Sequence, residues 1–248
     1  MVKLLTSVLG ISTILFFTYC LKNNNSEYNV DQDFDIISTF DGGDESNVED
    51  NTNVEDNTNG GGGSQEEVEI KVHSDEAMSY FKDIAYGTEF DGELSSPYKW
   101  KNDMKIYVDG QKPEYLMSEL KRIVAELNDI INPIEIKIVS TKESSNFVVY
   151  FGDNKTFDQK YNLVYPKYLE DNWGYFELYG NTGVMYVDLY RVDEIDAQKH
   201  LLREELTQSL GLVNDSWKYK NSIFYQGWTT TTEYSDIDRE LIDILYNN

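Results

Sequence analysis

The stretch "REELTQSLGLVND", residues 203–215, decides the fold because it combines a leucine stripe with two adjacent glutamates and a glycine. Leucines spaced mostly by four residues lie on one face of a helix, and such a face docks on a sheet. Gly211 is suited to a left-handed cap at the end of that helix, with Leu212 closing over it. The stripe itself comprises Leu201, Leu202, Leu206 and Leu210.

The glutamate pair, Glu204 and Glu205, is not explained by helix packing. Consecutive helical residues point about 100° apart, so one of the two carboxylates should lie closer to the sheet. A buried carboxylate without partners is costly, so it should be protonated or met by amides, hydroxyls or a cation. We therefore predict a polar cluster here, and the nearest partners in the sequence are Gln208, Asn214, Ser216 and the tyrosine-rich tail.

The spacing of these polar residues is that of metzincin-type zinc proteases, H-E-x-x-H-x-x-G-x-x-H. Two ligands four residues apart share a helix face, the adjacent glutamate is the base, and the glycine lets the chain reverse to bring a third ligand. In this chain Glu204, Glu205, Gln208, Gly211 and Asn214 occupy the five positions. Of these five, only the candidate general base Glu205 and the turn residue Gly211 are the same residue types as in the metzincin motif.

The residues at the three zinc-ligand positions argue against an active zinc protease. Gln208 and Asn214 offer neutral amide oxygens, whereas zinc prefers nitrogen and sulfur. A hard divalent cation held by Glu204, Gln208 and Asn214 is the alternative, provided that Glu205 or Asp215 joins the set. We expect no zinc here and assign no metal or other cofactor.

Two further residues bear on this site. His200 lies four residues before Glu204 and could extend the same helix face, although a lone helical histidine is more often a hydrogen-bonding or surface residue. Met185 is the last methionine of the chain, so the methionine turn that lies beneath the metal in metzincins is missing. Whether the chain is an enzyme stays open at this point.

Three strings near the end of the chain resemble a family of bacterial lipoproteins catalogued as domain of unknown function 2927. They are "REELTQSLGLVNDS" (203–216), "KNSIFYQ" (220–226) and "SDIDRELIDILY" (235–246), and together they cover roughly the last fifty residues. The resemblance implies a zincin-like fold, meaning a mixed sheet with one helix that carries the site. It implies no particular activity.

Periodicity upstream agrees with an α+β domain. A helix is expected at 75–87 with Met78 in its buried face, a second helix runs from Pro113 to Pro133, and the stretch around Pro166 looks irregular. We therefore predict one mixed β-sheet with a long helix before it, the motif helix after it and a short C-terminal helix. Strands are expected at 104–110, 134–141 and 146–153, a hairpin at 174–180 and 183–191, the motif helix at 194–210 and the last helix at 235–247.

The first twenty residues carry one positive charge, Lys3, before an apolar run that ends at Cys20. We predict that residues 1–20 are a lipoprotein-type signal peptide and that Cys20 is lipidated, which would anchor the protein to a membrane of the cell envelope. Tyr19 departs from the small residue that usually precedes such a cysteine. An uncleaved N-terminal anchor, or secretion, is the alternative.

Composition separates a linker from a folded domain. Residues 21–65 are rich in Asn, Asp, Glu, Ser and Gly and repeat "NVEDNT" at 47–58, so we predict a disordered acidic linker followed by a zincin-like domain at 66–248. The net charge of −24 over 248 residues repels a polyphosphate backbone and excludes nucleic acid as a partner. Cys20 is the only cysteine, so the domain has no internal disulfide.

Two functions follow from these observations. The first is a non-catalytic module that binds a protein or peptide at the envelope, for example along an edge strand at 174–180, because the metal ligands are exchanged and tyrosines often anchor interfaces. The second is a peptidase-like hydrolase with Glu205 as general base and an atypical metal, or a water held by Glu204 and Gln208. Carbohydrate binding by exposed aromatic residues is a third possibility.

Overall fold

The computed structural model describes residues 73–88, 92–93 and 96–247. The predicted signal peptide, Cys20 and the acidic linker lie outside these residues. No helix within the described part of the chain is both long and apolar enough to cross a bilayer.

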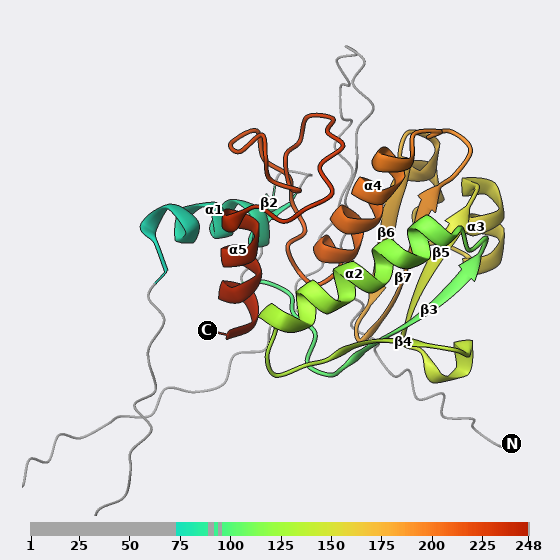
Figure 1. Cartoon of the computed structure of the whole chain (residues 1–248), viewed down its shortest axis with the longest axis horizontal. Coiled ribbons are helices and arrows are strands. Elements are labelled where there is room, and N and C mark those ends of the chain that lie inside the picture. The colour runs from blue at the N-terminus through green and yellow to red at the C-terminus, as the bar shows by residue number, and fades with distance from the viewer. Residues whose placement is uncertain (1–72, 89–91, 94–95, 248) are drawn as a thin grey trace, which may run out of the picture. The chain divides into compact units, whose positions relative to one another are not determined.

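A five-stranded mixed sheet forms the centre of the domain, as predicted (Figure 1). The strand order is β4-β3-β5-β7-β6, in which neighbours are parallel except for β6, which pairs antiparallel with β7 and forms one edge. The strands are β3 (Met104–Gly110), β4 (Ile136–Val139), β5 (Phe147–Gly152), β6 (Gly174–Tyr179) and β7 (Thr182–Asp188). Two short strands, β1 (Gly87–Thr88) and β2 (Gly92–Glu93), pair separately.

Helices α2 (Glu114–Ile130) and α4 (Ile195–Gln208) lie side by side on one face of the sheet (Figure 1). Alternate strand residues point to this face and form the main core with the apolar faces of both helices. The residues between them in the strands face a second, more aromatic core on the opposite side. Helices α1 (Asp75–Ala85) and α5 (Asp236–Asn247) pack against each other, and α5 also contacts α2.

The second core contains the elements that sequence periodicity did not predict. Residues expected to be irregular form helix α3 (Asn154–Tyr161) and the 3₁₀ turn η2 (Pro166–Glu170), and η1 (Lys142–Ser144) precedes β5. Helix α3 begins where the Asp153 side chain accepts a hydrogen bond from the Thr156 amide, and it ends at Asn162 in the left-handed conformation. Because Phe157 is its only buried residue, the helix has no apolar repeat to detect.

The prediction that Met78 lies on the buried face of α1 is wrong. Met78 is 38% exposed, and Tyr80 is fully buried in its place. The Tyr80 hydroxyl donates to the Ser222 hydroxyl at 3.1 Å, so the polar end of the ring has a partner inside the domain. Helix α5 begins with a capping box, because Ser235 and Asp238 exchange backbone-to-side-chain hydrogen bonds.

Helix α4 ends inside the protein, and the carbonyl groups of the two residues that follow it are met by large side chains. The Trp100 indole donates to the Ser209 carbonyl, and the Tyr246 hydroxyl donates to the Leu210 carbonyl, both at 2.9 Å. Gly211 then reverses the chain at a φ of +127°. A Cβ at Gly211 would lie 2.0 Å from the Tyr98 carbonyl oxygen, so only glycine is accommodated here.

We expect Gly211→Ala to lower the free energy of unfolding by at least about 3 kcal/mol, because strained backbone and a backbone clash act together. Gly180→Ala is the matched control: Gly180 also has a positive φ, +63°, but a Cβ there meets nothing within 4 Å. It should cost about 1 to 2 kcal/mol. Urea unfolding followed by circular dichroism measures both. Equal losses in the two variants would show that the clash is absent.

Candidate functional site

The polar residues of α4 are buried together with its leucines. Glu204 is 2% exposed and Glu205 is 0% exposed, so the prediction that one of them lies inside holds for both. Arg203, the residue before them, is also fully buried. Three consecutive charged residues on one helix point in three directions, and each therefore requires its own surroundings.

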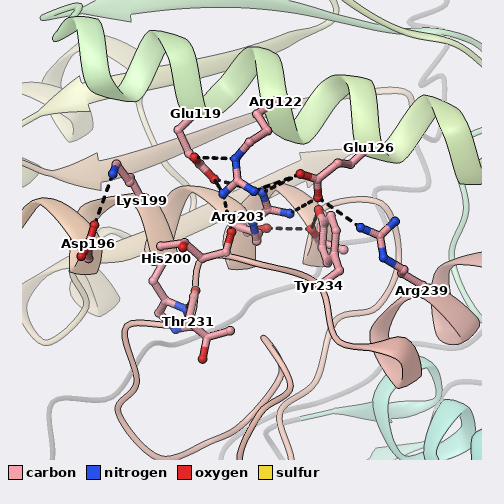
Figure 2. A network of polar contacts seen from close by, with 12 residues as sticks. Glu119, Arg122, Glu126, Asp196, Lys199, His200, Arg203, Thr231, Tyr234 and Arg239 are labelled. Atoms are coloured by element: carbon pink, nitrogen blue, oxygen red, sulfur yellow. Dashed lines mark hydrogen bonds and ion pairs between the residues drawn. The ribbon is translucent and has the colours of Figure 1, made fainter.

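Arg203 points at α2 and ties the two helices together (Figure 2). Its Nη1 donates to Glu126 Oε2 at 2.8 Å, and its Nη2 donates to Glu119 Oε1 at 3.0 Å. The Tyr234 ring packs on the guanidinium, with 4.3 Å from Cζ to the ring centre. The charge of Arg203 is thus neutralised on one side by carboxylates and covered on another by an aromatic face.

Arg122 on α2 completes this network. It donates to both oxygens of Glu119, at 3.0 and 2.8 Å, and to Glu126 at 3.1 Å. Arg239 of α5 reaches Glu126 at 3.7 Å from the exposed side. Sequence reasoning missed the network, although Glu119 and Glu126 stand seven residues apart and so share one face of the predicted helix.

His200 lies one turn before Glu204 on the same face, as its spacing suggested, and it is buried. Its Nδ1 donates to the Thr231 carbonyl at 2.7 Å, which leaves Nε2 facing Glu204 Oε2 at 3.4 Å. Burial lowers the pKa of His200 to about 4 despite the bond to Thr231. The imidazole is therefore neutral near pH 7, and its contact with Glu204 is not an ion pair there.

Glu205 lies against the first residue of the edge strand. A Cβ at Gly174 would stand 2.5 Å from Glu205 Oε1 and 2.7 Å from its Cγ. The absence of a side chain at Gly174 makes the space that the glutamate occupies between α4 and β6. The candidate general base is therefore enclosed by the sheet.

The remaining motif positions point to different parts of the domain. Gln208 Nε2 donates to Asp215 Oδ1 at 2.6 Å. Asn214 instead turns to the end of α1, where its side-chain amide donates to the Asp83 carbonyl at 2.9 Å and its backbone N–H donates to the Ile84 carbonyl at 3.1 Å. Asn214, which the sequence suggested as a partner of the glutamates, therefore bonds to the end of α1 instead.

Ser216 also serves the loop after α4. Its backbone N–H donates to the Phe224 carbonyl, its carbonyl accepts from the Gln226 N–H, and its hydroxyl accepts from the Lys218 N–H. These bonds close the loop on itself. Ser216 is therefore not a partner of the glutamates, as the sequence had suggested.

These positions do not fit the three-ligand zinc site of a metzincin. The Asn214 amide is bonded to the end of α1, so the third ligand position is turned away from Glu204, and the second position, Gln208, donates to Asp215. Amide groups are also poor zinc ligands. Across residues 73–88, 92–93 and 96–247, no three His, Cys, Asp or Glu side chains are grouped to hold a metal ion.

A pocket of about 370 Å³ lies beside the motif, near the start of α4. Its walls include two tryptophans, Trp173 and Trp228, whose ring centres are 5.1 Å apart. Trp228 also packs edge-on against His200. Sequence reasoning did not find this pocket, because its residues come from several segments: Trp173, Arg191, Val192, Asp193, Glu194, Ala197 and Trp228.

We expect Arg203→Ala to lower the free energy of unfolding by about 3 to 5 kcal/mol, because it removes the fully buried counter-charge of Glu119 and Glu126 and leaves them only the more exposed Arg122 and Arg239. Arg239→Ala is the matched control. Arg239 is largely exposed and lies 3.7 Å from Glu126, so its loss should cost about 1 kcal/mol or less. Chemical denaturation of both variants measures these losses in the free energy of unfolding. A loss below 1 kcal/mol for Arg203→Ala would mean that the network contributes little.

Stability should depend on pH through Asp215, whose pKa burial raises to about 8 even though Gln208 donates to it. Between pH 4 and 8 the unfolded chain has lost this proton and the folded chain keeps it, so stability falls as pH rises. Asp215→Asn removes this titrating group, so the free energy of unfolding should decrease less steeply as pH rises. Urea midpoints from pH 4 to 8 for both proteins measure it. Parallel pH profiles would contradict the assignment.

Comparisons with known proteins identify a family and several similar structures. A family model described as "Protein of unknown function (DUF2927)" matches residues 74–248. A search of curated proteins finds no match. Among solved structures, one titled "Crystal structure of myroilysin" has a TM-score of 0.41 at 11% identity and covers 62% of this chain and 87% of its own. A second, "Structure of myroilysin", has a TM-score of 0.38 at 15% identity and covers 60% and 96%.

The domain has the two features that the sequence resemblance implied for a zincin-like fold, a mixed sheet and one helix, α4, that carries the motif. The family match extends from α1 to the end of α5 and so includes every element that positions the motif. The chain belongs to the DUF2927 family.

Proposed function

We propose that this zincin-like domain is a non-catalytic module that binds a protein or peptide. The observation that carries the proposal is the use of the motif side chains within the fold. Gln208 is bonded to Asp215, Asn214 holds the end of α1, and Glu204 faces a buried histidine. A helix whose polar groups are engaged in this way provides a rigid scaffold for a binding surface.

The alternative is a hydrolase with Glu205 as general base. A general base must lie within hydrogen-bond reach of the proton that it removes from water or substrate. The Glu205 side chain is fully buried and its carboxylate is in close contact with the backbone of Gly174. A substrate would have to separate α4 from β6 before it could reach this group, which favours the non-catalytic function.

The place of binding differs from the one that the sequence suggested. Strand β6 is the edge of the sheet, but its residues Phe176 and Leu178 are fully buried. Many tyrosines, among them Tyr175 and Tyr186, are buried in the cores. Among the described residues, aromatic side chains are exposed at Tyr190, Trp217 and Trp228, and of these three Trp228 lines the pocket, so we propose that a partner binds at the pocket beside α4.

Export and membrane tethering are part of the proposal and are supported by the sequence of residues 1–20. An apolar segment that ends in a single cysteine and continues into an acidic, polar linker matches a lipoprotein that carries its domain away from the membrane. In this arrangement the binding surface would act at the cell envelope.

The test uses the full-length chain purified in mild detergent, with metal analysis, a panel of peptide and ester substrates, and a defined library of unstructured peptides. We expect less than one metal ion in ten chains, no hydrolysis that Glu205→Gln removes, and saturable peptide binding that a chelator leaves unchanged. Asp196→Asn, an exposed position on the same helix, is the matched control. Metal-dependent turnover that is lost only in Glu205→Gln, or an absence of peptide binding, would overturn the proposal.

A further inference from the structure

The pocket beside α4 has the size and the walls of a site for a single side chain. Its volume of about 370 Å³ lies near the lower end of the range of small-ligand sites. Trp173 stands just before β6, Trp228 lies in the loop that precedes α5, and residues 191–194 join β7 to α4. Three separate segments thus meet around one concave surface.

The two tryptophans form an aromatic corner. Their rings are perpendicular, with an interplanar angle of 89° and 5.1 Å between ring centres, and Trp228 is 38% exposed. His200 supports Trp228 from within the protein at 6.4 Å. The face of an indole carries negative potential and attracts ammonium and guanidinium groups.

Arg191 lines the same pocket, but its guanidinium is engaged by the protein. Its Nε donates to Asp188 at 2.6 Å, and its Nη1 donates to the Glu170 carbonyl at 2.6 Å. Its Nη2 makes three more bonds, whose acceptors are the Leu169 carbonyl, the Asn172 carbonyl and the Tyr186 hydroxyl. The positive charge is paired with Asp188, and these bonds engage four of the five N–H donors of the guanidinium, which leaves one Nη1 N–H for any anionic ligand.

Apart from Arg191, the charged side chains that line the pocket are negative. Asp193 and Glu194 are both exposed and line it. Glu194 is the N-cap of α4 but makes no side-chain capping bond, so its carboxylate is not engaged with the helix end. The helix N-terminus contributes a positive charge of only about one half, which two full carboxylates outweigh.

We propose that this pocket binds the cationic end of a lysine or arginine side chain from a basic peptide segment. The cation would lie against the Trp228 face with Asp193 and Glu194 at the rim. The net charge of −24 would draw a basic partner toward the domain. This inference rests on the proposed function and specifies the chemistry of its partner.

The test titrates the full-length protein with short unstructured peptides that contain one central lysine or arginine, followed by tryptophan fluorescence and calorimetry. Matched peptides carry acetyl-lysine, citrulline or glutamate at the same place, and a neutral oligosaccharide is a separate arm. We expect binding by the cationic peptides that weakens with salt, and a loss of at least about fivefold for each neutral replacement.

Two variants locate the site. Trp228→Ala should weaken binding about five- to thirtyfold, and Asp193→Asn combined with Glu194→Gln should weaken it and reduce its salt dependence. The controls are Trp217→Ala, an exposed tryptophan outside the pocket lining, and Asp129→Asn combined with Glu143→Gln, which removes the same amount of charge elsewhere. All of these positions are exposed, and circular dichroism confirms that each variant is folded.

The outcomes separate this inference from the proposed function. Peptide binding without preference for a cation, or binding that the pocket variants leave unchanged, would overturn the inference and leave the binding module intact. Binding of the neutral oligosaccharide in a Trp228-dependent manner without binding of cationic peptides would assign the pocket to carbohydrate instead. An absence of binding by every library peptide would remove the proposed function and this inference with it.

Discussion

The burial of Arg203 is the constraint on which the rest of the site depends. A guanidinium inside a protein must be paired and hydrogen-bonded, and here α2 supplies Glu119 and Glu126 for that purpose. This pairing fixes the rotation of α4 about its own axis. Once Arg203 points at α2, each of the next two residues points about 100° further round the helix. Glu204 then lies on the face that carries His200, and Glu205 lies against Gly174.

The surroundings of the motif side chains differ from those of a metal site. A metal site needs side chains that converge on one point and leave an open position for water. In this domain Asn214 bonds the end of α1, away from the face that Glu204 and Gln208 share, and Gln208 donates to Asp215. The helix retains its place on the sheet while its polar groups stabilise the packing around it.

Much of the fold was predictable because its signals are local. The leucine stripe of α4, the apolar repeat of α2 and the glycine-flanked hairpin each set one element, and these elements form the predicted mixed sheet and its helices. Helix α3 was not predictable, because Phe157 alone is buried in it. The site was predicted in part. Burial of one glutamate followed from its place beside the stripe, but burial of both, the Arg203 partners and the pocket depend on contacts between distant segments, which spacing along the chain does not specify.

The turn at Gly211 has a consequence for any attempt to build a zinc site on this helix. It delivers Asn214 to the carbonyl groups at the end of α1 and not to the face that Glu204 and Gln208 share. The triple replacement Glu204→His, Gln208→His and Asn214→His would therefore reproduce the sequence of a zinc motif without its geometry. A three-ligand zinc centre here would also require rebuilding the loop that follows the turn.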